Sequence, residues 1–181
     1  MNVYEVIFYG DSSRKRPLIC KVEEELECKK LKIGEEFNGT LKMEIIQDGK
    51  SDDFVKNTDE LLIVDKDIKV CFESNKIEDI QFIPVQIGSA DYYVINILKK
   101  VSDSLDLQNS KYMIYPDNFP NEKVRGKIGT IWQTVLLKDK IDGHIFRIEE
   151  HLNDIFVDEY LKTLIENNGF SGIDFNKVKV L

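Results

Sequence analysis

Ser12 is the residue of this sequence that most resembles a catalytic nucleophile. It follows a stretch rich in β-branched and aromatic residues, 1–9, and the pair Gly10-Asp11. The stretch predicts a strand, so the serine would lie just beyond its end. A serine hydroxyl becomes a nucleophile when a histidine takes its proton and a carboxylate orients that histidine. The only two histidines are His144 and His151.

The order Gly10-Asp11-Ser12 resembles the opening motif of the SGNH/GDSL hydrolases. That family takes its histidine and aspartate from a C-terminal Asp-x-x-His. Here Ile141 and Ile148 stand three residues before the two histidines, and the segment after the serine reads RKRP, which does not begin a helix. The pattern argues against a hydrolase, which is kept as the alternative enzyme with Ser12 as its nucleophile.

Metal and cofactor chemistry have no support in the motifs. The chain has no HExxH, CxxC or DxDxDG pattern and no GxxxxGK[ST] or GxGxxG loop. Cys20, Cys28 and Cys71 are odd in number and lack metal-ligand spacing, which predicts buried thiols rather than disulfides or a zinc site. We therefore expect no catalytic residues, no metal and no cofactor.

Acidic side chains are the remaining candidates for a functional surface. The chain has 33 acidic and 25 basic residues, a formal net charge of -8. This excess of negative charge argues against binding of nucleic acid and favours a basic protein partner. Solubility alone is the other explanation of the charge. The candidate partner-binding residues are Glu149, Glu150, Asp154 and Glu159, together with Asp52 and Asp53. For each of them the alternative is an ordinary solvated edge.

The elements that would position these residues include an internal resemblance. Residues 62–85 and 155–178 are identical at eight of 24 positions without a gap, at an offset of 93. In each copy an aspartate, Asp65 or Asp158, is placed to cap a helix. Apolar residues then recur at helical spacing, an asparagine follows, and a strand comes next. Each copy therefore predicts a helix and a strand on a shared sheet, and duplication and chance both remain open as its origin.

The rest of the chain predicts mostly strands. Residues 91–98 are apolar on both faces, as a central strand is, whereas 23–31 stay open between helix and strand. Hairpin turns are expected at Asn38-Gly39 and Asp142-Gly143, and residues 115–127 predict an exposed loop. Trp132 falls in an apolar strand, where a core position is favoured over an exposed binding role.

The expected architecture is one α+β domain over residues 1–181, with a mixed sheet and two or three helices. The length suits one domain, and the longest uncharged stretches are half of what a membrane helix needs. The first residues lack the features of a signal peptide. These observations predict a cytoplasmic protein without membrane contact.

Residues 53–178 resemble a family of bacterial immunity proteins, the eleventh in its series, whose members are encoded beside polymorphic toxins. The resemblance is carried, in order, by the following pieces: Asp53-Phe54, Ile63-Val64-Asp65, Phe82-Ile83-Pro84-Val85, Tyr92-Tyr93-Val94-Ile95-Asn96, Leu105-Asp106, Ile145-Phe146-Arg147, Ile155-Phe156-Val157-Asp158 and Gly172-Ile173-Asp174-Phe175. The family usually has serine where Asp65 and Asp158 stand, a change that preserves capping. Residues 1–50 show no match and are expected to be variable strands.

The resemblance implies a protein that binds and neutralises a cognate toxin without catalysis. It supplies no functional residue to carry over to this chain. A general protein-binding adaptor is the second alternative function. Self-association stays open.

Overall fold

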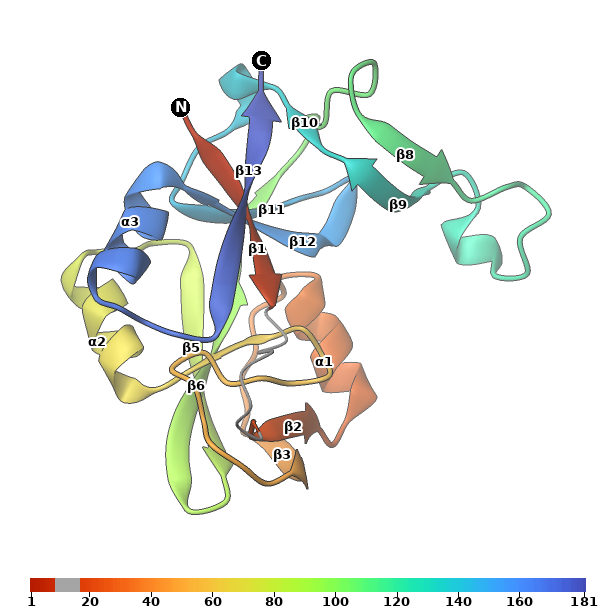
Figure 1. The fold of residues 1–181 in the computed structure, drawn as a ribbon. Coiled ribbons are helices and arrows are strands. Elements are labelled where there is room, and N and C mark those ends of the chain that lie inside the picture. The colour runs from red at the N-terminus through yellow and green to blue at the C-terminus, as the bar shows by residue number, and fades with distance from the viewer. Residues whose placement is uncertain (9–16) are drawn as a thin grey trace.

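The computed structural model describes residues 1–8 and 17–181, and two β-sheets form its body (Figure 1). The first sheet has six strands in the order β10-β13-β1-β12-β11-β7. Their bounds are β10 (Val135–Leu136), β13 (Ile173–Val180), β1 (Val3–Phe8), β12 (His151–Asp158), β11 (Ile145–Ile148) and β7 (Lys100–Val101). The predicted first strand is confirmed as β1, which lies inside this sheet.

The second sheet has five strands in the order β2-β3-β5-β6-β4. Their bounds are β2 (Ile19–Val22), β3 (Leu41–Gln47), β5 (Ile80–Ile87), β6 (Ala90–Ile97) and β4 (Leu62–Val64). The predicted central strand over 91–98 is confirmed as β6, with β5 on one side and β4 on the other. Both sheets contain parallel and antiparallel pairs.

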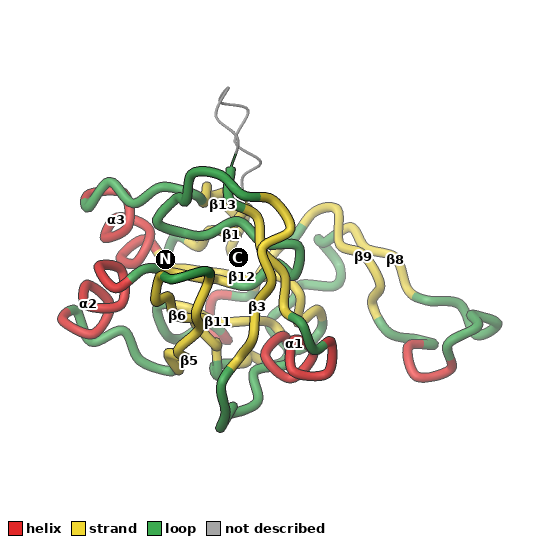
Figure 2. The backbone as a smooth tube through the Cα atoms, turned by 90° about the horizontal axis from the view of Figure 1, so that it is seen from below, coloured by secondary structure: helices red, strands yellow, loops and turns green. Residues whose placement is uncertain are grey.

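The remaining elements complete an α+β architecture, as the sequence predicts. A separate pair of strands, β8 (Lys111–Ile114) and β9 (Ile128–Gln133), extends to one side of the body in both views (Figures 1 and 2). The described residues also form α1 (Glu25–Lys32), α2 (Lys66–Ser74) and α3 (Glu159–Asn167), with short 3-10 turns at Glu122–Val124 and Lys138–Lys140. The segment left open at 23–31 is therefore mostly helix.

The internal resemblance corresponds to two equivalent substructures, but the prediction that they share one sheet is wrong, because one lies in the second sheet and the other in the first. The first unit is β4, α2 and β5, and the second unit is β12, α3 and β13; both helices and both following strands begin and end 93 residues apart. The carboxylate of Asp65 accepts the Ile68 N–H at 3.0 Å, and that of Asp158 accepts the Leu161 N–H at 2.9 Å. These bonds satisfy N–H groups that a helix leaves free at its start, so the predicted caps are confirmed.

Each unit also holds an antiparallel strand between its own two. In the first unit this strand is β6, where Tyr93 lies opposite Val64 and Pro84. In the second unit it is β1, where Tyr4 lies opposite Val157 and Lys177. These partners are again 93 residues apart, so Tyr93 and Tyr4 occupy equivalent places although they come from unrelated parts of the chain.

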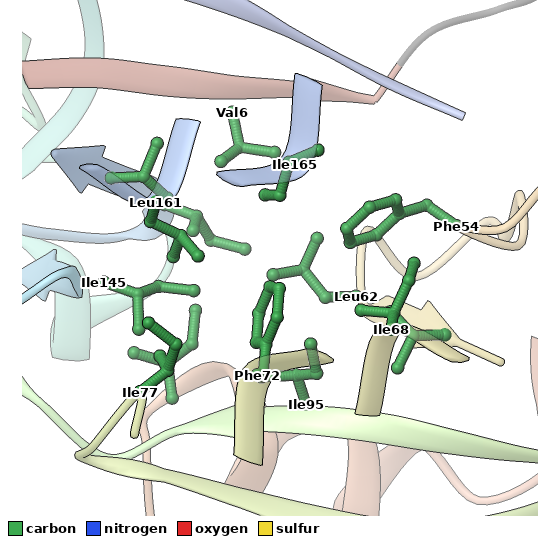
Figure 3. Packing of buried hydrophobic residues seen from close by; sticks show 14 of the residues in the cluster. Val6, Phe54, Leu62, Ile68, Phe72, Ile77, Ile95, Ile145, Leu161 and Ile165 are labelled. Atoms are coloured by element: carbon green, nitrogen blue, oxygen red, sulfur yellow. The ribbon is translucent and has the colours of Figure 1, made fainter. Parts of the chain in front are cut away.

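One apolar cluster joins the two units. Ile68 and Phe72 of α2 are buried in it together with Leu161 and Ile165 of α3, and the labelled side chains converge from both sides in Figure 3. Burial of this surface stabilises the fold by about 25 cal/mol per Å². The Tyr160 hydroxyl donates to Asn75 Oδ1 at 3.2 Å, which ties the two helices together at the rim.

Both predicted hairpin turns are wrong. Phe37 lies outside any strand and bonds through its backbone to the Gln81 side chain, while β3 pairs with β2 and β5. Gly143 has the positive φ expected of a turn, 88°, yet β10 before it pairs with β13 and β11 after it pairs with β12 and β7. Turn-forming residues fixed the local backbone in the second case without selecting the strand partners.

The prediction of buried thiols is confirmed for two of the three cysteines. Cys20 and Cys28 are buried, whereas Cys71 is only partly buried. Burial raises the pKa of the Cys20 thiol to about 12, so it is unreactive at neutral pH. Among the helices of residues 1–8 and 17–181, none is long and apolar enough to cross a membrane.

Candidate partner-binding surfaces

The acidic candidates at the β11–β12 turn differ in what they bind within the chain. Glu149 is exposed, and its side chain forms no ion pair or hydrogen bond with the described residues. Glu150 is half-buried and accepts the Leu105 N–H at 3.3 Å through Oε1, whereas its Oε2 is buried without a partner in the described structure. Glu149 is thus available to another molecule, and Glu150 fixes the loop at Leu105.

Asp154 lies midway along β12 and is bound to His151. Asp154 Oδ2 and His151 Nδ1 are 2.8 Å apart, and the hydrogen bond to this carboxylate raises the pKa of His151. Asp154 also faces Glu5 of β1. Burial, followed by the charge of Asp154, raises the pKa of Glu5. The two carboxylates therefore form a half-buried acidic pair in the first sheet.

A buried arginine supports this part of the sheet. Arg147 is 2% exposed and donates through one terminal nitrogen to the carbonyls of Leu152 and Asn153. Its Nε has no partner in the described structure. Burial lowers the pKa of the guanidinium to about 10, which leaves it charged at neutral pH. Arg147 belongs to the interior and is not part of an exposed surface.

Glu159 begins α3 at the other end of β12. Its Oε2 accepts hydrogen bonds of 2.7 Å from the Tyr4 hydroxyl and from Asn2 Nδ2. These bonds lower the pKa of Glu159. The neighbouring Asp158 caps the helix with one oxygen and binds His144 Nδ1 at 2.8 Å with the other. Glu159 therefore joins α3 to β1 while remaining exposed.

Asp52 and Asp53 lie beside the start of β13. Asp53 Oδ2 accepts from the Ser171 N–H at 2.7 Å and from the Ser171 hydroxyl at 2.8 Å. The next residue, Gly172, leaves no room for a side chain, because a Cβ there would lie 2.3 Å from the carbonyl oxygen of Phe54. Asp53 therefore holds together two segments that are 118 residues apart.

The acidic candidates are distributed along the molecule. Glu149 and Glu150 precede the eight-residue strand β12, and Glu159 follows it. A strand of this length spans about 27 Å, so the two ends belong to different parts of the surface. Of the six candidates, Glu149 is the one most free to meet a partner.

A cavity of about 260 Å³ opens beside Glu5 and Asp154. Phe8, Glu60, Asn153 and Ile155 also line it. The described lining contains three carboxylates, those of Glu5, Glu60 and Asp154, and no lysine, arginine or histidine. Such a wall repels anions.

The two histidines do not form a hydrolytic site with the described residues. His144 and His151 are each bound to an aspartate, Asp158 and Asp154, and no serine of the described residues hydrogen-bonds to either ring. Ser12 itself lies outside the described residues. Within 1–8 and 17–181 no group of three or more histidine, cysteine or acidic side chains is placed to hold a metal ion.

Trp132 corrects the sequence prediction. It lies on β9 and its side chain is 67% exposed, not in the core. Its neighbour Ile131 packs against the apolar cluster that contains Leu136 and Phe156. The strand is therefore apolar on both faces, although the fold covers only one of them. Sequence reasoning also missed Met113 and Ile114 on β8, which are exposed too. An apolar strand alone does not reveal which of its faces the fold will cover.

The comparison with protein-family models gives one match, to the immunity protein family Imm11, over residues 35–180. This covers 146 of the 181 residues. The chain belongs to the Imm11 family. No curated protein matches the sequence.

The Imm11 match includes both equivalent units and the β8–β9 pair. It begins 18 residues before the resembling region identified in the sequence, at 35 in place of 53, and ends two residues after it. All six acidic candidates and Trp132 lie within it. The central strand of the second unit, β1, lies outside the match. The first sheet therefore contains one strand that the family model does not cover, between two strands that it does cover.

Proposed function

We propose that this chain neutralises a cognate bacterial toxin by binding it in a stoichiometric complex. The observation that carries the proposal is the Imm11 family match over residues 35–180. Membership of an immunity protein family favours binding over catalysis. The proposed setting is the cytoplasm, with no cofactor.

The net charge of this chain favours a basic toxin as its partner. A formal charge of -8 attracts a basic protein over distances of about a Debye length, 8 Å at physiological ionic strength. A toxin that acts at few copies per cell requires binding of about 1 nM or tighter, which is about 12 kcal/mol. An interface of this kind typically buries about 1,600 Å², more than any single acidic candidate offers.

The test is co-expression of the chain with the C-terminal domain of the large protein encoded next to it. Survival of the cells and a one-to-one complex on co-purification are the expected results. Survival without a complex would contradict stoichiometric binding and would point to an enzyme that acts on the toxin's product, with Ser12→Ala as the next variant. If the cells do not survive and no complex is recovered, the proposed function is contradicted.

Steering by the acidic surface is tested by association kinetics. Charge reversal of Glu149 should slow association several-fold at low salt and leave dissociation nearly unchanged, because exposed charges act mainly on encounter. Glu149→Gln is the matched control with half the charge change. An association rate that is independent of salt would contradict a steering role.

A further inference from the structure

The β8–β9 pair and its connecting loop form a projection that we call the arm, residues 111–133. In Figures 1 and 2 the arm extends from the body beyond the end of the first sheet. The two strands pair with each other and form a sheet of their own. An isolated pair of strands is barely stable in water, so the arm needs stabilising contacts beyond its own strand pairing.

The connecting loop braces the tip of the arm. The rings of Tyr115 and Phe119 lie 4.6 Å apart, and Gly129 leaves the space for Tyr115, whose ring would be 2.8 Å from a Cβ at that position. Arg125 Nε donates to the Phe119 carbonyl at 2.7 Å, and another of its nitrogens meets Glu122 at 3.1 Å. The tip is therefore an ordered structure rather than a loose loop.

The base of the arm is clamped to the body. The Val135 N–H donates to Ser110 Oγ at 3.0 Å, and this hydroxyl donates to the Val135 carbonyl at 3.2 Å. Ile128 and Ile131 of β9 pack against the cluster that contains Leu136. A rigid arm loses little conformational freedom when it binds, which favours affinity.

The two strands of the arm carry exposed apolar side chains, with Trp132 near the base. Trp132, Met113 and Ile114 are all exposed. Trp132 is the extra residue of an irregularity in the pairing, between the pairs Lys111–Gln133 and Tyr112–Ile131. Tryptophan is highly buried on average, and it is the residue most enriched among those that dominate binding energy. An exposed tryptophan on a braced support is the arrangement expected of a binding residue.

The charge of the arm is opposite to that of the rest of the chain. The arm contains four basic residues, Lys111, Lys123, Arg125 and Lys127, and two acidic ones, whereas the other 158 residues contain 21 basic and 31 acidic. Its net charge is therefore +2 against -10. The three lysines form no ion pair within the described part of the chain. A partner that complements the arm has an apolar pocket bordered by carboxylates.

We propose that the cognate toxin docks along the strands of the arm, with Trp132 in an apolar pocket of the toxin and the arm lysines facing carboxylates at its border. This inference rests on the proposed function. The acidic body and basic arm together form an electrical dipole. Complementary charges on a toxin that is basic overall and acidic at the pocket fix the orientation of the complex.

The first experiment measures the affinity of variants for the co-expressed toxin domain. Trp132→Ala should bind at least about 30-fold more weakly, the loss typical of a residue that dominates an interface. Ile46→Ala is the matched control, since Ile46 is 50% exposed on β3 of the body, and it should bind like the parent. Both variants should unfold at the parent's urea midpoint, because both side chains are exposed.

The second experiment uses the fact that Trp132 is the only tryptophan of the chain. The chain is labelled with 5-fluorotryptophan, so that it gives a single fluorine resonance whatever the toxin contains. The resonance should move on complex formation and lose its sensitivity to the change from H2O to D2O. A resonance that stays solvent-sensitive in a tight complex would overturn the proposal.

The third experiment separates the arm's charge from that of the body. Lys111→Glu should weaken binding several-fold at low salt and less at high salt, whereas Lys42→Glu on β3 should not weaken it. Equal effects of the two variants would contradict a local carboxylate border.

The outcomes distinguish the two proposals. If the parent chain does not bind the toxin domain, the proposed function and the arm's role both fall. If the parent binds and Trp132→Ala binds equally well, only the arm's role falls. If the parent alone is a dimer by light scattering and Trp132→Ala is a monomer, the arm joins two copies of this chain, which also overturns its role toward a toxin.

Discussion

The two equivalent units obtain the same local structure from similar residues, but they obtain their central strands differently. In the first unit β6 follows β5 after a two-residue turn, Gly88-Ser89. In the second unit β1 comes from the other end of the described chain and enters between β12 and β13. Local sequence determines the capped helix and its flanking strands in both cases. The strand that completes the sheet is selected by burial and pairing, which any suitable strand can satisfy.

The side-chain contacts above each central strand are similarly repeated. Lys69 Nζ lies 5.3 Å from the centre of the Tyr93 ring, and Lys162 Nζ lies 5.0 Å from that of Tyr4. Each lysine also binds a glutamate one turn later, at 2.5 Å for Glu73 and 2.6 Å for Glu166. Exposed pairs of this kind contribute little individually. Their repetition shows that the equivalence extends to the helix surface.

The largest expected effect tests whether the units share one core. Phe72 and Ile165 are equivalent positions in the same cluster. Phe72→Ala should lower the free energy of unfolding by about 3–5 kcal/mol, and Ile165→Ala by about 2–5 kcal/mol, because each leaves a cavity. Ile165→Val, at about 0.5–1.5 kcal/mol, is the mild control.

Urea unfolding followed by circular dichroism is the measurement for this pair. We expect a single transition in every variant, as for one domain. Two separate transitions in Phe72→Ala would show that the units are independent.

The second prediction uses a position where the units differ. Gly172 has φ +105° and faces the Phe54 carbonyl, whereas its equivalent, Asp79, already carries a side chain at φ 59°. Gly172→Ala should cost about 2 kcal/mol or more because backbone must move. Asp79→Ala should change stability by about 0.5 kcal/mol. Similar losses at both positions in thermal unfolding would contradict this account.

A smaller effect should appear where each helix ends. Lys76 has φ 54° and its equivalent, Gly169, has φ 69°. Lys76→Gly should stabilise the chain by about 1 kcal/mol, since a left-handed backbone costs a side-chain-bearing residue about that much. Gly169→Ala should lose a comparable amount, and no atom lies within 4 Å of the new Cβ to confuse the result. Urea unfolding in which Lys76→Gly destabilises the chain and Gly169→Ala stabilises it would contradict the left-handed backbone at these positions.

The smallest effect is a pH dependence confined to the second unit. Glu159 binds Tyr4, and its pKa is lowered in the folded state, while the equivalent position is Lys66. A lowered pKa contributes stability above the unfolded value, about 4.3, and loses it as the pH falls through the folded value. The stability difference between the parent and Glu159→Gln should therefore shrink from pH 5 to about pH 3. Lys66→Gln is the control, and its difference from the parent should stay constant over the same range.

The sequence was sufficient for features that depend on near neighbours. The offset of 93 residues identified both helices, both capping aspartates and both following strands, because capping bonds and helical spacing are local. Pairing was a different matter. Gly143 has the positive φ expected of a turn, but β10 pairs with β13, 44 residues further along the chain, and β11 pairs with the next strand, β12, and with β7, 47 residues earlier.

The candidate surface was less predictable for the same reason. Asp53 binds Ser171 and Glu159 binds Tyr4, and these partners are 118 and 155 residues apart. A count of charges cannot show that such carboxylates are already engaged within the chain. The exposure of Trp132 depends on the arm leaving the body at Ser110 and Val135, which no periodicity within 128–133 encodes.

The place of β1 has a consequence for synthesis on the ribosome. β1 emerges before any other described strand, yet both of its neighbours lie within residues 151–180. At translation rates of about 5–20 residues per second, it waits roughly ten to thirty seconds for them. The first unit can assemble during this interval, because its three strands lie within residues 62–97. A nascent chain that stops before residue 173 therefore lacks a closed first sheet, and synthesis of β12 and β13 sets the moment at which this half of the molecule becomes ordered.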